Sequence, residues 1–376
     1  MGAALRSRLH RAASSRSLTV SISDARALFD PEGTYLNTAS YGLPPRPAWD
    51  ALQRVLEEWR HGRTSWEGWS EDTDRARATF ARLVGSSAER VAIGATVSGL
   101  VGLVAASLPA GTRVIVPEIE FTSTLFPFMV QPGLEVRTVP PAQLAEAIDE
   151  RTGAVAFSAV QMSTGEVADL DAILAAAEAH DVLTLVDATQ AAGWLPLEAD
   201  RFDFLVAAGY KWLISPRGTA WMTVAPERLD AIVPSAAGWF AGDDVYDAYI
   251  GPPLRLAEGA RRLDTSPAWF SYVGSLPALE LLEAVGVEAI HEHNVRVANH
   301  FRARLDLPPS NSVIVSIPWP GDINALRAEG VQAAMPGGSL RLGFHLYNDE
   351  EDADRAVDVL QSLRQPSRGS DPLEGG

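Results

Sequence analysis

The chain contains no cysteine among its 376 residues. This absence excludes a disulfide framework, a thiolate metal site and a cysteine nucleophile, and we expect no metal site. Long apolar runs are also missing. The longest stretch of this kind, residues 97–110, is interrupted by Ser and Gly and falls short of the ~18 residues that a membrane-spanning helix needs. We therefore expect no membrane partner.

Lysine is almost absent as well. Of the 31 residues that are Lys or Arg, only Lys211 is a lysine. Arginine serves as well as lysine on a surface, but a guanidinium group stays protonated and cannot attack a carbonyl as a free amine does. Lys211 is therefore the first candidate for chemistry.

Positive charge is scarce too, since the net charge is −17. No basic footprint for a nucleic acid is visible, so no nucleic-acid partner is expected. Residues 1–20 lack acidic residues and are rich in Arg, Ser and Ala, a composition typical of a mitochondrial transit peptide, whereas the alternative is a disordered extension over residues 1–21. We favour the extension and a cytoplasmic location, and we expect residues 366–376 to form a disordered tail.

Between these ends, short apolar runs alternate with amphipathic stretches. This alternation predicts an α/β domain with a mostly parallel sheet over residues 22–244. A smaller α+β C-terminal domain is predicted for residues 245–365, and the first residues of the large domain are expected to pack with it. Seven strands are predicted for the large domain: residues 90–93, 113–116, 135–139, 154–159, 182–186, 202–206 and 219–224.

An acid and an amine follow two of these strands. Asp187 ends the apolar run VLTLV, and Lys211 comes just after the next predicted strand. Ligands of open α/β sheets bind at this edge, so both side chains should enter one crevice. A carboxylate beside a pyridine nitrogen and an amine on an aldehyde suit pyridoxal 5′-phosphate, held as a Schiff base on Lys211. Gln190 is placed to donate to the cofactor's phenolic oxygen. The alternative makes Asp187 a helix N-cap and Lys211 a surface residue.

With these motifs, DATQ at 187–190 and GYKWL at 209–213, the sequence resembles the class V aminotransferase family of fold-type I pyridoxal phosphate enzymes over residues 30–365. This group includes cysteine desulfurases, selenocysteine lyases, isopenicillin-epimerase-like proteins and kynureninases. The resemblance implies a fold-type I transferase fold, an amino acid substrate and a homodimer. It implies that Asp187 faces the pyridine nitrogen, Gln190 the phenolate, and that Lys211 carries the cofactor.

The resemblance also assigns the remaining cofactor contacts. Thr96 and Val97 would hold the phosphate at a helix N-terminus, and Phe121 would stack on the ring without moving protons as a histidine does. Tyr210 is expected beside the cofactor. Thr265 or Ser266 would reach the phosphate of a neighbouring subunit.

For the substrate, the resemblance assigns Arg341 to the α-carboxylate, an assignment that suits a planar guanidinium. Asn37 and Ala39 belong to a segment that would close over the substrate. Gln161, beside Met162, would stand in for an asparagine near the phenolic oxygen. Four tryptophans are expected in the core, with a pocket for a bulky substrate as the alternative: Trp66, Trp69, Trp239 and Trp269.

The sequence identifies the reaction less clearly than it identifies the cofactor. A chain without cysteine cannot form a persulfide of its own, so we favour β-elimination by a carbon–sulfur lyase. Transamination and epimerisation remain open, and kynureninase-like hydrolysis is less favoured. An epimerase would need a second proton donor, for which Tyr41, His345 and Tyr347 are candidates. A non-enzymatic binding protein would be expected to have lost Lys211, Asp187 or Arg341.

Overall fold

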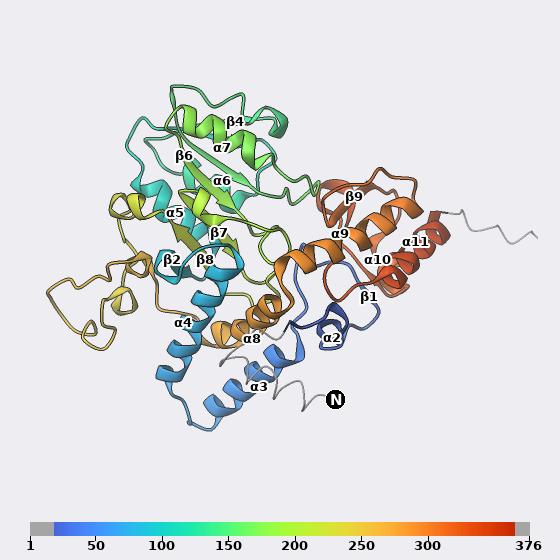
Figure 1. Ribbon diagram of the computed structural model, residues 1–376, viewed down its shortest axis with the longest axis horizontal. Helices are drawn as coiled ribbons and strands as arrows, with labels where there is room; N and C mark the ends of the chain where they lie inside the picture. Colours follow the sequence, from blue (N-terminus) through green and yellow to red (C-terminus); the bar gives the residue numbers. More distant parts are fainter. Residues whose placement is uncertain (1–18, 365–376) are drawn as a thin grey trace, which may run out of the picture.

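The computed structural model describes residues 19–364, and its centre is a seven-stranded sheet (Figure 1). The strand order is β2-β8-β7-β6-β5-β3-β4. All neighbours run parallel except β8, which is antiparallel to both β2 and β7. The strands are β2 Val91–Gly94, β3 Arg113–Pro117, β4 Glu135–Val139, β5 Thr152–Ser158, β6 Leu183–Asp187, β7 Phe204–Ala208 and β8 Ala220–Val224.

Both faces of this sheet are buried. Along β5, Ala154 and Ala156 join one apolar cluster, whereas Val155 and Phe157 join another, as the alternation of side chains along a strand requires. Helices cover the two faces, which explains why most of the strands are apolar, whereas the edge strand β4 is largely exposed and carries polar residues. These helices include α4 Trp66–Leu83, α5 Val97–Ser107, α6 Thr122–Met129 and α7 Leu170–Ala179.

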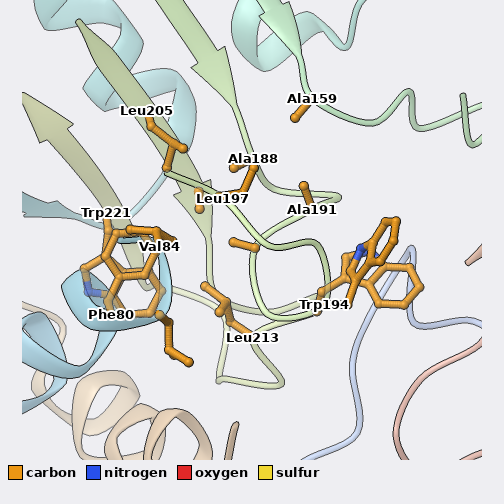
Figure 2. Packing of buried hydrophobic residues seen from close by; sticks show 14 of the residues in the cluster. Phe80, Val84, Ala159, Ala188, Ala191, Trp194, Leu197, Leu205, Leu213 and Trp221 are labelled. Atoms are coloured by element: carbon orange, nitrogen blue, oxygen red, sulfur yellow. The ribbon is translucent and has the colours of Figure 1, made fainter. Parts of the chain in front are cut away.

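The apolar cluster on one of these faces includes several large aromatic side chains. The rings of Phe80 from α4 and Trp221 from β8 stack with centroids 4.9 Å apart, and Val84 and Leu205 belong to the same apolar cluster (Figure 2). Trp194 and Leu213 belong to the same cluster (Figure 2), and the Trp194 ring packs against that of Trp212, the residue after Lys211, with centroids 5.9 Å apart. The loop that carries Lys211 therefore rests on a packed core.

The C-terminal elements form a second group around two small sheets. Strand β11 pairs antiparallel with β9, and β1, from the beginning of the chain, pairs parallel with β10. The early elements β1 and α2 thus lie beside the C-terminal helices (Figure 1). The elements of this group are α2 Ile22–Arg26, β1 Thr34–Tyr35, α9 Val287–Arg304, β9 Ile314–Pro318, α10 Ile323–Ala328, β10 Val331–Gln332, β11 Ser339–Gly343 and α11 Glu350–Arg364.

Two further helices connect the groups. Helix α8, Trp269–Val285, packs against α3, Arg46–Arg60, and against α4. The predicted boundary between residues 244 and 245 remains a prediction, as do the N-terminal extension and the C-terminal tail, most of which lies outside the described residues. The fold class and the seven strands of the sheet are confirmed, with strand ends that differ by at most two residues. Within residues 19–364, no helix combines the length and apolarity needed to cross a membrane.

Candidate active site

A cavity opens at the edge of the sheet where the parallel strands end. Its walls come from the residues that end or follow β2, β3, β5, β6 and β7. This edge is the place where open α/β sheets bind ligands. Seven of the predicted site residues meet there: Thr96, Val97, Phe121, Asp187, Gln190, Tyr210 and Lys211.

Lys211 is buried in this cavity, with 6% of its surface exposed. Its Nζ lies 5.3 Å from the centre of the Phe121 ring and 5.9 Å from that of Tyr210. Burial lowers the pKa of Lys211 to about 8, and the positive charges of Arg341 and Arg217 act in the same direction, whereas Asp187 opposes them. The amine is thus poised to lose its proton near neutral pH.

Asp187 ends β6 with its carboxylate fixed by two donors. The Thr124 hydroxyl donates to Oδ2 at 2.8 Å, and the Thr189 backbone N–H donates to Oδ1 at 2.8 Å. Thr124 belongs to α6, so the helix after Phe121 holds the acid in place. The acid and the amine share one crevice, as the strand-end spacing predicts.

Gln190 is oriented by two contacts on opposite sides of its amide. Trp212 Nε1 donates to its Oε1 at 2.7 Å, and its Nε2 donates to the Ala39 carbonyl at 3.0 Å. An amide nitrogen has two hydrogens, so one of them remains for a ligand. Gln190 can therefore donate into the cavity, and its role toward the phenolic oxygen remains a prediction.

The N-terminus of α5 forms one end of the cavity. Thr96 is the N-cap, and its Oγ1 accepts from the Gly99 N–H at 3.2 Å. Val97 follows with its side chain buried against the core, and it can offer only its backbone N–H to a ligand. Free N–H groups at the start of a helix bind phosphate well.

Glu120, which the sequence analysis did not single out, fixes Phe121. Its buried carboxylate accepts from the backbone N–H of Phe121 at 2.8 Å and of Ser158 at 2.7 Å, and also from the Ser158 hydroxyl. Burial raises the pKa of Glu120 despite these bonds. Gln161 also donates to Glu120, at 3.2 Å, so its amide serves this carboxylate and does not line the cavity. Met162 lines it instead.

Arg341 lies just behind this wall, 3% exposed. Its Nη1 donates to the Met162 carbonyl at 2.9 Å and its Nη2 to the Ser40 hydroxyl at 2.6 Å, while Nε is buried without a partner. Burial lowers its pKa to about 10. A buried cation with an unused donor suits an anionic ligand such as a carboxylate.

The N-terminal segment docks onto the site without lining the cavity. Asn37 forms a backbone bridge with Gly343, and its Oδ1 is buried without a partner. Ala39 contributes its carbonyl to Gln190. Thr265 and Ser266 also lie outside the cavity of their own chain. The substrate role of the first pair and the phosphate role of the second pair remain predictions.

Two of the three candidate proton donors are occupied elsewhere. His345 is fully buried between the Trp212 carbonyl and Asn294, and burial lowers its pKa to about 3. The Tyr347 hydroxyl is bonded to Thr38, and burial raises its pKa. Neither side chain can exchange a proton with a ligand in the cavity. Tyr41 is 42% exposed, with its ring 5.4 Å from that of Tyr210.

The four tryptophans form an aromatic cluster, in which Trp69 and Trp239 also pack against buried apolar side chains. They are half-buried and contact one another, with Trp66 and Trp239 rings 5.3 Å apart, together with Tyr246 and Tyr249. None of the four lines the cavity. The packing of Trp69 and Trp239 agrees with the first expectation, and the pocket for a bulky substrate remains a prediction.

The donors in the cavity match one cofactor. Lys211 offers an amine for an aldehyde, Asp187 an anion for a pyridinium nitrogen, α5 a phosphate site, and Phe121 a ring for stacking. Across residues 19–364, no group of His, Asp and Glu side chains is arranged to hold a metal ion. The fold and this donor set define a fold-type I pyridoxal phosphate enzyme.

Comparison with known proteins agrees with this class. The family model "Aminotransferase class-V" matches residues 59–318, and the chain belongs to this family. It is 28% identical to the "Uncharacterized aminotransferase YcbU" of Bacillus subtilis, over 87% of this chain and 93% of the relative. It is 27% identical to the isopenicillin N epimerase of Streptomyces clavuligerus, over 90% and 96%. A solved structure of a cystine C–S lyase shares the fold, with a TM-score of 0.80, 22% identity, and 88% and 98% coverage.

Proposed function

We propose that this chain is a pyridoxal phosphate-dependent carbon–sulfur lyase that eliminates the sulfur substituent of a cysteine-type amino acid. The products would be pyruvate, ammonia and a thiol or sulfide. The observation that carries this proposal is the single amine of the cavity, Lys211, with a pKa of about 8. Elimination needs one base and a good leaving group, and Lys211 is sufficient as that base.

The other side chains then hold and orient the substrate. Arg341 would bind the α-carboxylate through its unused Nε. Asp187 would keep the pyridine nitrogen protonated, and when bound, the cofactor supplies an electron sink for the electrons left at Cα. Neutral Lys211 would remove the Cα proton and afterwards return it to the departing group or to water.

The fate of the sulfur follows from the composition. A desulfurase passes sulfur to a cysteine thiolate, and this chain has no cysteine to receive it. The sulfur would therefore leave with the departing group.

Epimerisation is the second candidate, because the chain aligns over 90% of its length with an isopenicillin N epimerase. An epimerase returns the proton from the opposite face, and Phe121 has no proton to give. Tyr41 is the remaining candidate donor, since His345 and Tyr347 are bonded and buried. A substitution Tyr41→Phe would abolish epimerisation and leave elimination intact.

One assay separates these reactions. The holoenzyme is incubated with a panel of amino acids, including cysteine and cystine, in deuterated water. Pyruvate together with a thiol product supports elimination. Accumulation of the pyridoxamine form would overturn it in favour of transamination, and deuterium at Cα without pyruvate would overturn it in favour of epimerisation.

We also propose that the chain acts as a homodimer and resides in the cytoplasm. Large apolar side chains are exposed at several places, among them the end of α6, helix α3 and the loop before α8, where Ile250 is 87% and Leu254 82% exposed. Apolar surface of this kind marks an interface. In a dimer, Thr265 or Ser266 would supply a hydroxyl to the partner's phosphate site.

A further inference from the structure

The residues expected to hold the cofactor phosphate in this chain, Thr96 and Val97, carry no positive charge. A phosphate ester carries about −1.5 to −2 charges at pH 7. Thr96 and Val97 offer hydrogen-bond donors but no cation. Of the described residues lining the cavity, only Lys211 and Arg217 are basic, and Lys211 is committed to the aldehyde.

The sheet brings Arg217 to the phosphate end. Gly94, the last residue of β2, pairs with Ala220, the first residue of β8, and the two strands are antiparallel. The segment that enters β8 therefore runs beside the segment that leaves β2 for the N-terminus of α5. The Tyr272 hydroxyl lies within hydrogen-bond distance of both carbonyls, 2.8 Å from Gly94 and 3.0 Å from Ala220. This contact fixes the junction of the two segments.

The backbone around Arg217 is held as well. The Ser271 hydroxyl from α8 donates to the Arg217 carbonyl at 2.8 Å. The next residue, Gly218, has φ of +101°, and a Cβ there would lie 3.0 Å from the Ser271 hydroxyl. A side chain is disfavoured at this position on both grounds. The turn therefore presents Arg217 in a defined direction.

The guanidinium group of Arg217 lies over an aromatic platform and has no acidic partner. Its central carbon is 4.7 Å from the centre of the Tyr210 ring, and its charge reaches Lys211, whose pKa it lowers. In the described part of the chain, no carboxylate forms an ion pair with Arg217. Stacking on Tyr210 limits the motion of a long side chain at an exposed position.

We infer that Arg217, stacked on Tyr210, binds the phosphate of the cofactor together with the N-terminus of α5. A planar guanidinium can donate to two phosphate oxygens at once. Tyr210 acts as the platform for this group, which gives a reason for an aromatic residue next to Lys211.

The test compares two ligands that differ only in the phosphate. The full-length chain, freed of cofactor, is titrated with pyridoxal 5′-phosphate and with pyridoxal. We expect Arg217→Gln to weaken pyridoxal phosphate binding about 10- to 100-fold, as for the loss of a charge-assisted contact, and to leave pyridoxal binding unchanged. Arg217→Lys should weaken pyridoxal phosphate binding less, because lysine keeps the positive charge but cannot donate to two phosphate oxygens in the planar arrangement of a guanidinium group. Arg137→Gln, an exposed arginine of β4 that does not line the cavity, is the matched control and should change neither affinity.

Inorganic phosphate gives a second measurement. It should compete with pyridoxal phosphate in the wild type and in Arg137→Gln, and compete much less in Arg217→Gln. Equal weakening of both pyridoxal ligands would overturn the inference, since Arg217 would then act on the aldehyde end or on the fold. Unchanged pyridoxal phosphate binding in Arg217→Gln would overturn it too.

Discussion

At the scale of single residues, burial and neighbouring positive charges both lower the pKa of the Lys211 amine. Burial removes water from the charged form, and the nearby arginines repel it, so the pKa falls to about 8 although Asp187 opposes the change. The same amine can thus bind an aldehyde and accept a proton near neutral pH. Because it is the only lysine, its chemistry can be followed without interference from other side chains.

Replacing Lys211 with Ala should abolish covalent attachment of the cofactor and the yellow colour that accompanies it. Reduction with borohydride followed by mass spectrometry of peptides would find the pyridoxyl group on the peptide containing residue 211 in the wild type. The double variant Lys211→Ala/Arg137→Lys restores a lysine at an exposed position and should remain unlabelled. Labelling of that surface lysine at the wild-type level would contradict a specific role for Lys211.

The reactivity of Lys211 should rise with pH. In the cofactor-free chain, modification by an amine-directed reagent should increase with a midpoint near the pKa of about 8. Asp187→Asn should move this midpoint lower, because the carboxylate favours the protonated amine. Peptide mapping separates Lys211 from the N-terminal amine. A midpoint at the ordinary lysine value of 10.5 in the wild type would refute the effect of burial.

The same pKa affects stability. Between pH of about 8 and about 10.5, the unfolded chain holds the Lys211 proton and the folded chain does not, so stability rises with pH across this window. Below it both states are protonated, and the cost of burying the charge is fully present. Urea unfolding of the cofactor-free chain at several pH values would measure the rise. Lys211→Met should lack this contribution, so identical pH slopes for the two proteins would argue against it.

The sequence could predict residues whose position follows from a strand end. Asp187 and Lys211 are of this kind, because apolar runs placed both at one edge of the sheet. It could not reveal that Glu120 fixes Phe121, or that His345 is fully bonded, because those contacts join segments far apart in the chain. Arg217 was missed for the same reason: only the pairing of β2 with β8 shows where it lies.

At the scale of elements, residues 39–42, which follow β1, contact both the large sheet domain and the C-terminal group of elements. Ala39 binds Gln190 through its carbonyl, and Ser40 accepts from Arg341. Two residues on, the Gly42 N–H donates to the Tyr210 carbonyl at 2.8 Å. The segment thus connects Arg341, expected to bind substrate, with the loop that carries Lys211.

Gly42 should not tolerate a side chain. A Cβ there would lie 2.1 Å from the Lys211 carbonyl oxygen, which is backbone and cannot move aside cheaply. Gly42→Ala should therefore destabilise the fold by about 1–3 kcal/mol, as overpacking does, and weaken cofactor binding. Thermal unfolding and a cofactor titration would measure both effects. Gly238→Ala, where a Cβ meets nothing within 4 Å, is the control, and equal stability of the two variants would disprove the contact.

The elements themselves were predictable to different degrees. Most strands of the large sheet are apolar runs, which the sequence displays directly, and the exposed edge strand β4 is the exception. The pairs β1 with β10 and β9 with β11 join distant segments, and β1 and β10 span only two residues each. No local pattern distinguishes such short strands from loops.

At the scale of the whole molecule, the exposed apolar loop before α8 should determine assembly. We expect light scattering to give twice the 40.3 kDa mass of one chain. Changing Ile250 and Leu254 to Asp should yield monomers with weakened cofactor affinity, because charges are unfavourable inside an interface. The single substitution Arg137→Gln should remain dimeric. A wild-type protein that stays monomeric at micromolar concentrations would refute the homodimer.

The burial of the only lysine also determines which chemical reagents can modify the surface of the protein. Outside the cavity, the side chains of this protein offer no primary amine and no thiol. Reagents that attach dyes, polymers or solid supports through these groups would react with the holoenzyme only at its N-terminal amine. The protein is therefore suited to uniform, oriented immobilisation by ordinary amine chemistry, with the cofactor shielding the one lysine.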